Sequence, residues 1–135
     1  MIGGGFRNVL INGDFRINQR EKRTVGASTN SYFYDRWEGF AATNDISSSI
    51  ESGGTKIIIA DPGSIIVQTI EGTNIFGGNY VLSWSGSMTT ATVGTSSISN
   101  GGTVYIPPKT QTYVTFGSGS LYWAQLELGT IPTLS

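Results

Sequence analysis

The chain has 135 residues, enough for one domain with a single hydrophobic core. Hydrophobic residues make up 38% of it and charged residues only 13%, Gly occurs 19 times, and the formal net charge is −1. With no Cys and no His, the composition excludes disulfides, thiolate nucleophiles, imidazole catalysis and most transition-metal sites. Abundant Gly, Ser and Thr beside Ile, Val, Tyr and Trp favour an all-β protein with many turns.

Extended runs follow one another along the chain, and no window shows the i, i+3, i+4, i+7 apolar pattern of an amphipathic helix. Gly, Pro and Asn-Gly turn signals divide these runs at intervals of roughly 8–12 residues. The spacing predicts an all-β jelly-roll β-sandwich of about 8–10 short antiparallel strands with little or no helix. In chain order the extended runs are Phe6–Ile11, Asp14–Asn18, Tyr32–Phe40, Ile46–Glu51, Lys56–Ala60, Ser64–Glu71, Tyr80–Ser85, Thr89–Val93, Thr103–Ile106, Thr110–Phe116 and Leu121–Leu128.

Side-chain alternation within these runs predicts which faces are buried. In residues 80–85, Tyr80, Leu82 and Trp84 share one face of a half-buried strand. The runs at 57–59 and 65–67 are apolar on both sides, as expected of strands covered on both faces. The polar stretch at 87–102 is rich in β-branched residues and predicts small exposed strands and turns. We expect one domain over residues 1–135, with a flexible Gly-rich arm at residues 1–5 and no membrane span.

Charge is divided unevenly along the chain. Residues 1–36 hold six cationic and three acidic side chains, whereas the remainder holds two cationic and six acidic ones. A basic cluster near the N-terminus suits contact with an acidic partner surface, although it also fits a solvated loop. It offers too few cations, without interleaved aromatic residues, for nucleic acid. The candidate contact residues in this cluster are Arg16, Arg20, Lys22 and Arg23.

Several stretches resemble a family of bacteriophage virion proteins. NVLINGDFRINQR (8–20) followed by YFYDRW (32–37) is similar to that family's opening, and LYWAQLELGTIPT (121–133) is similar to its closing strand. IIVQTIE (65–71) and NYVLSWSG (79–86) resemble its middle strands. The resemblance implies a jelly-roll sandwich carried on tail fibres, head fibres or the capsid, commonly as a trimer.

The chain resembles only this module, without a fibre shaft or tip domain, which favours a small protein bound directly to the capsid. We therefore expect a homotrimeric decoration, or cement, protein that binds across neighbouring major capsid subunits, on the outer capsid surface of a virion assembled in the host cytoplasm. Multivalent contact lets weak individual contacts give tight occupancy. The alternative is a tail- or head-fibre module that recognises a host surface glycan.

The opening motifs also have a structural interpretation. The Asn-Gly-Asp triplet can close a turn through side-chain-to-backbone hydrogen bonds. The Asp-Arg pair of the second motif can form a partly buried ion pair over the neighbouring indole ring. The residues interpreted in this way are Asn12, Gly13, Asp14, Asp35, Arg36 and Trp37.

No residues are predicted to be catalytic, because the spacing of the carboxylates does not place two of them in one cleft. No cofactor is predicted. A structural Ca²⁺ held by Asn12, Asp14 and Glu127 is an alternative to simple hydrogen bonding by these residues. Tyr122 and Trp123 are adjacent in a predicted strand and should point to opposite faces, so one of them is a candidate partner contact.

Overall fold

The computed structural model describes residues 9–10, 15, 24–26, 29–34, 36–42, 45–51, 54–60, 63–75, 77–88 and 90–129. Twelve strands and one 3₁₀ turn, at Gly72–Asn74, make up the secondary structure of this part of the chain. The prediction of an all-β sandwich is confirmed. The strands are β1 Asn30–Tyr32, β2 Glu38–Phe40, β3 Ile46–Glu51, β4 Gly54–Ile59, β5 Ile65–Ile70, β6 Gly78–Ser85, β7 Thr90–Val93, β8 Ser96–Ser97, β9 Gly102–Ile106, β10 Thr112–Gly117, β11 Gly119–Leu121 and β12 Trp123–Leu128.

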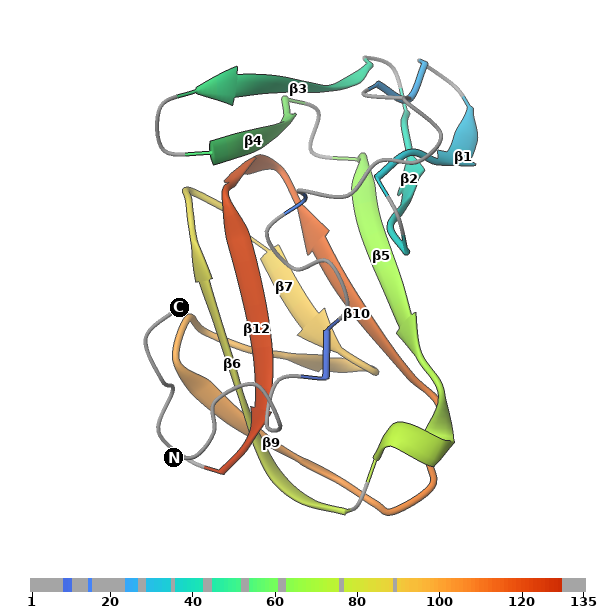
Figure 1. Ribbon diagram of the computed structural model, residues 1–135, viewed down its shortest axis with the longest axis vertical. Helices are drawn as coiled ribbons and strands as arrows, with labels where there is room; N and C mark the ends of the chain where they lie inside the picture. The colour runs from blue at the N-terminus through green and yellow to red at the C-terminus, as the bar shows by residue number, and fades with distance from the viewer. Residues whose placement is uncertain are drawn as a thin grey trace.

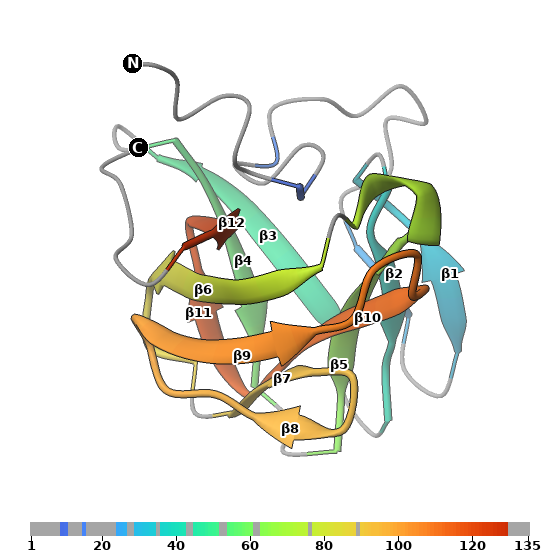
Figure 2. The same ribbon diagram turned by 90° about the horizontal axis from the view of Figure 1, so that it is seen from below.

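These strands form three antiparallel sheets. The largest has the order β1-β2-β5-β10-β7-β8, and the two three-stranded sheets have the orders β12-β6-β9 and β11-β4-β3. Figure 1 shows β6 and β12 together in one layer, β5, β7 and β10 in another, and the β3–β4 hairpin across one end. In Figure 2 the order β12, β6, β9 can be followed across one layer of the sandwich.

The strand pairs are nested in the chain. β4 pairs with β11, β5 with β10, β6 with β9, and β7 with β8. The chain thus folds back on itself as one long antiparallel hairpin whose turn lies between β7 and β8. Rolling such a hairpin so that β10 also pairs with β7 closes the two layers, which is the arrangement of a jelly roll.

The core lies between the layers because alternate residues of each strand face inward. In β6, Tyr80, Leu82 and Trp84 belong to the buried core, as the alternation predicts. Aromatic rings meet at its centre, where the rings of Trp37 and Phe116 have centroids 6.2 Å apart and Phe116 meets Trp84 edge-on at 5.4 Å.

Two of the predicted extended runs are interrupted. The run at 32–40 is a hairpin of β1 and β2, whose loop is closed by hydrogen bonds from Trp37 N–H to Tyr34 O at 2.9 Å and from Phe33 N–H to Trp37 O at 3.1 Å. The run at 121–128 breaks at Tyr122, because β11 pairs with β4 and β12 pairs with β6 in a different sheet. At 32–40 the chain stays in one sheet and the interruption is the loop, whereas at 121–128 it passes from one sheet to another at Tyr122.

The connection from β6 to β7 is held against β11. Ser87 N–H donates to Ser120 O at 2.9 Å, and the two serine hydroxyls lie 3.0 Å apart. Gly86, at φ +137°, permits this contact, because a Cβ there would lie 2.1 Å from Ser120 O. The contact fixes the segment that carries Met88 into the sandwich.

Candidate functional site

The six-stranded sheet has one face in the core and one facing away from it. We call the second the outward face. Its side chains line up across the strands: the register places Tyr32, Glu38, Val67, Thr115, Thr92 and Ser97 in one row over all six strands. The outward face consists of Asn30, Tyr32, Glu38, Phe40, Ile65, Val67, Thr69, Thr92, Tyr113 and Thr115.

The outward face is apolar and uncovered. Tyr32 is 46% exposed, Phe40 36% and Tyr113 49%, while Ile65 and Val67 are partly exposed between them. Among its residues only Glu38 carries a charge. Three aromatic rings, two aliphatic side chains and threonine methyl groups on one side of a sheet form the kind of surface that proteins use to bind other proteins.

This face corrects one interpretation of the sequence. The apolar runs at 57–59 and 65–67 were expected to be covered on both sides. Instead, Ile57, Ile59 and Ile66 are buried, whereas the alternate residues Ile58 and Val67 remain partly exposed. A strand with both faces covered by its own chain and a strand with one apolar face exposed have the same sequence pattern. The sequence therefore did not predict the outward face.

The sheet β12-β6-β9 also has a side turned away from the core, and it has the opposite character. Here Val81 and Glu127 are fully buried and Ser83 is 6% exposed, although alternation turns all three away from the core residues Leu82 and Leu126. These residues are neighbours: Val81 lies opposite Glu127 across the β6–β12 ladder. The β6–β12 part of this side is covered in the folded chain, whereas Thr103, which lies opposite Val81, and Tyr105 are exposed on β9.

Two polar atoms on the covered side have no hydrogen-bond partner among the residues that the structure describes. Ser83 lies opposite Gln125 across β6 and β12, and both the Ser83 hydroxyl and Gln125 Oε1 are buried with no hydrogen bond to the described residues. A buried hydroxyl without a partner costs stability relative to an alanine at the same position. The covered side is therefore enclosed at some cost to folding.

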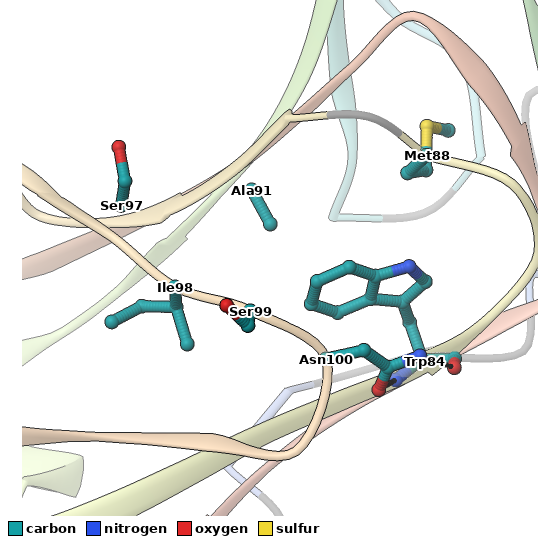
Figure 3. Close-up of a pocket in the computed structure, with 7 residues that line it drawn as sticks. All are labelled: Trp84, Met88, Ala91, Ser97, Ile98, Ser99 and Asn100. Atoms are coloured by element: carbon teal, nitrogen blue, oxygen red, sulfur yellow. Dashed lines mark hydrogen bonds between the residues drawn. The ribbon is translucent and has the colours of Figure 1, made fainter.

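A pocket of about 480 Å³ opens where the two layers meet at β6, β7 and β8 (Figure 3). The indole of Trp84 extends from β6 toward Ala91 and Met88, while the Ile98–Asn100 segment bounds the other side. None of the lining residues that the structure describes is charged. They are Trp84, Met88, Ala91, Ser97, Ile98, Ser99 and Asn100.

Asn100 shapes this pocket by completing the edge of β6. The β6–β9 ladder ends at the pair Leu82–Gly102. Beyond it, the Asn100 side chain takes the place of a neighbouring strand: Trp84 N–H donates to Asn100 Oδ1 at 3.0 Å, and Asn100 Nδ2 donates to Trp84 O at 2.7 Å. Both backbone groups of Trp84 are thereby satisfied without a strand beside them.

The predicted contact residues Tyr122 and Trp123 lie at the junction of β11 and β12, and both are partly buried. Trp123 lies opposite Ser85 of β6, and the ammonium of Lys56 lies 5.9 Å from the centre of the Tyr122 ring. Because the strand breaks between them, they do not form the two faces of one continuous strand. They form a partly buried aromatic pair next to a cation.

The structure describes only some residues of the two opening motifs. Trp37 is fully buried against Phe15 and Phe116, and Arg36 is exposed in the β1–β2 loop at φ +73°. The ion pair predicted for Arg36 involves Asp35, which lies outside the described residues. The remaining predicted site residues that lie outside them are Asn12, Gly13, Asp14, Arg16, Arg20, Lys22 and Arg23.

Of the residues considered as an alternative calcium site, Glu127 is buried on the covered side, while Asn12 and Asp14 lie outside the described residues. Within the described ranges, no three acidic side chains gather where they could hold a metal ion. In the same residues, no helix is long and apolar enough to cross a membrane. A scan against protein-family models and a search of curated proteins found no match to this chain.

Proposed function

We propose that this chain is a structural protein of a bacteriophage virion, a homotrimeric decoration protein that binds across neighbouring major capsid subunits and stabilises the head. The opening and closing motifs support the virion assignment, and the jelly-roll fold agrees with it. The observation that carries the proposal is the outward face. An uncovered apolar side of a six-stranded sheet is the surface that an assembling protein needs.

The size of the outward face supports a role in assembly. The six strands hold 3, 3, 6, 6, 4 and 2 residues, and at about 3.3 Å per residue and 4.8 Å between strands they cover roughly 400 Å² in projection. A stable interface buries about 800 Å² on each partner. The outward face can supply about half of that area in one continuous patch, and its rim can add to it.

A ring of three copies needs a second surface, because in such a ring each copy contacts the next through two different patches. We assign this second surface to the pair Tyr122–Trp123, which lies in different sheets from the outward face. Its neighbour Lys56 is cationic, and the single charge of the outward face is the carboxylate of Glu38. The two patches thus combine aromatic surface with opposite charge.

Contact with the capsid is assigned to the basic cluster of Arg16, Arg20, Lys22 and Arg23. Each copy contributes few charges, so a single contact is weak at physiological salt. Three copies that bind at once convert the second and third contacts into intramolecular ones, and this raises the occupancy of the capsid. In this scheme the chain needs no catalytic residues and no cofactor.

Binding to capsids tests the function. We expect the gene to neighbour a major capsid gene, and the purified protein to bind expanded capsids of that phage that lack it. Bound protein should raise the temperature at which the capsids release their DNA, measured by dye fluorescence. A variant with Arg20, Lys22 and Arg23 replaced by Ser should lose at least tenfold in affinity and keep its fold. Failure of the wild-type protein to bind these capsids would refute the proposal.

A further inference from the structure

Asn100 and Gly101 form one of the two Asn-Gly pairs in the chain, the other being Asn12–Gly13. Asn followed by Gly is the dipeptide most prone to deamidation, because a residue without a side chain leaves its backbone nitrogen accessible to the preceding Asn. Asn100 is exposed, so water reaches it, and a Cβ at Gly101 would meet no atom within 4 Å. Neither exclusion of water nor crowding therefore protects this pair.

Hydrogen bonds to β6 hold both groups that would react. The side-chain amide carries the carbon that is attacked, and it is bound twice to Trp84: Oδ1 accepts from Trp84 N–H at 3.0 Å, and Nδ2 donates to Trp84 O at 2.7 Å (Figure 3). The attacking nitrogen belongs to Gly101, and its N–H donates to Leu82 O at 2.8 Å. We call these three hydrogen bonds the Asn100 clamp. The clamp opposes the reaction, because attack requires the Gly101 nitrogen to give up its proton and the Asn100 side chain to rotate freely.

The clamp sits on a short turn that precedes β9. Gly102 N–H donates to Ser99 O at 2.7 Å and closes this turn. A Cβ at Gly102 would lie 2.9 Å from Ser99 O, so a larger residue would force the turn to shift. Because the turn is short and lies at the surface, it can open locally, at a fraction of the free energy needed to unfold the sheets.

We propose that Asn100 is a site of spontaneous deamidation that reacts only when the Asn100 clamp opens. In the open state the Gly101 nitrogen attacks Asn100 Cγ and forms a cyclic succinimide. The bond between Cγ and Nδ2 breaks, and ammonia leaves with the proton of the Gly101 nitrogen. Water then opens the ring and gives aspartate or isoaspartate at position 100.

The product cannot restore the clamp. An aspartate carboxylate has acceptor oxygens and no donor, so where Nδ2 donated to Trp84 O, two acceptors would face each other. Isoaspartate also adds a methylene group to the backbone of the turn. The reaction is therefore one-way, and the deamidated fraction of the protein increases with the time that the turn spends open. It does not depend on the proposed function, since the clamp involves neither the outward face nor the basic cluster.

Peptide mapping by mass spectrometry measures the reaction at both Asn-Gly pairs, because they fall in different tryptic peptides, 8–16 and 57–109. In urea that unfolds the protein, we expect Asn12 and Asn100 to deamidate at similar rates. In the folded protein the rate at Asn100 should fall on the order of 100-fold, since each of the three hydrogen bonds favours the closed state about fivefold. A folded rate within about tenfold of the rate in urea, or no reaction of Asn100 in urea, would overturn the proposal.

A variant of the turn tests the gate without changing the reacting pair. Gly102→Ala should speed the reaction of Asn100 in the folded protein at least about fivefold and leave the rate in urea unchanged. Gly26→Ala is the matched control, because a Cβ there meets only Thr29 Oγ1, at an ordinary 3.7 Å, and it should react like the wild type. Circular dichroism checks that both variants fold. Equal folded rates in Gly102→Ala and the wild type would show that the turn does not control the reaction.

A second variant tests the effect of the product and does not rely on the first. Asn100→Asp introduces the carboxylate directly and should speed hydrogen exchange of the Trp84 and Gly101 amides at least about tenfold, measured by NMR. Asn79→Asp makes the same chemical change at an exposed residue of β6 and should leave exchange at both amides unchanged. Wild-type exchange rates in Asn100→Asp would contradict the claim that the product cannot close the clamp.

Discussion

Two sheet surfaces face away from the core, and they differ in burial. From their composition alone, the apolar surface would be expected to be buried and the partly polar one exposed, but the opposite is found. On the sheet β12-β6-β9 the turned-away side is partly polar and is buried over β6 and β12, with Ser83 and Glu127 enclosed beside Val81. On the six-stranded sheet it is apolar and exposed, with Tyr32 and Tyr113 about half accessible. Whether the folded chain buries the face of a strand is therefore not decided by how apolar that face is. The folded chain covers the partly polar side and leaves the apolar outward face exposed, as is expected of a protein whose apolar face binds another subunit.

The largest expected effect compares two valines at the centres of these surfaces. Val81→Asp places a carboxylate in a fully buried site and should lower the free energy of unfolding by at least about 3 kcal/mol, because the charge has neither water nor a partner. Val67→Asp places the same group on the outward face opposite Glu38 and should cost about 1 kcal/mol, through strand propensity and repulsion between the two carboxylates. Urea unfolding at low protein concentration measures both. Equal losses would show that the two surfaces are not different.

A smaller effect tests whether burying the unpaired Ser83 hydroxyl on the covered side lowers the stability of the protein. Ser83 and Ser64 are both buried, but Ser64 accepts a hydrogen bond from Ala42 N–H at 2.8 Å whereas the Ser83 hydroxyl has no partner among the described residues. Ser64→Ala should destabilise the protein by about 1–2 kcal/mol. Ser83→Ala should leave stability unchanged or raise it by up to about 1 kcal/mol. In thermal unfolding, the melting temperature of Ser64→Ala should fall, whereas that of Ser83→Ala should stay the same or rise, and a loss of stability in Ser83→Ala would refute the assignment.

Much of the fold could be predicted from the sequence, because alternation and turn residues act locally. The inward set of β6 and the all-β class follow from side-chain period and from Gly and Pro punctuation. The break at Tyr122 could not be predicted, since leaving one sheet for another changes the partners of a strand and not its pattern. The outward face was missed for a related reason: nothing in Ile65-Ile66-Val67 tells whether the alternate side chains are covered.

The pocket was also beyond prediction. Trp84 was expected to be a core residue, and it is 8% exposed, yet its ring borders a pocket whose other wall comes from residues 97–100. The Asn100 side chain that closes the edge of β6 lies 16 residues from Trp84, in a polar stretch that predicted only small strands and turns. Long-range pairing of this kind depends on the tertiary path of the chain, and a single sequence carries no signal for it.

The oligomeric state of the wild-type protein and of Val67→Asp, measured by sedimentation velocity over a range of micromolar concentrations, tests the outward face most directly. The assembly role predicts a trimer for the wild type, a folded monomer for Val67→Asp, and an unchanged trimer for the control Thr103→Asp, whose exposed position lies on β9 of the other sheet. A monomeric wild type, or a Val67→Asp protein that still forms trimers, would contradict it.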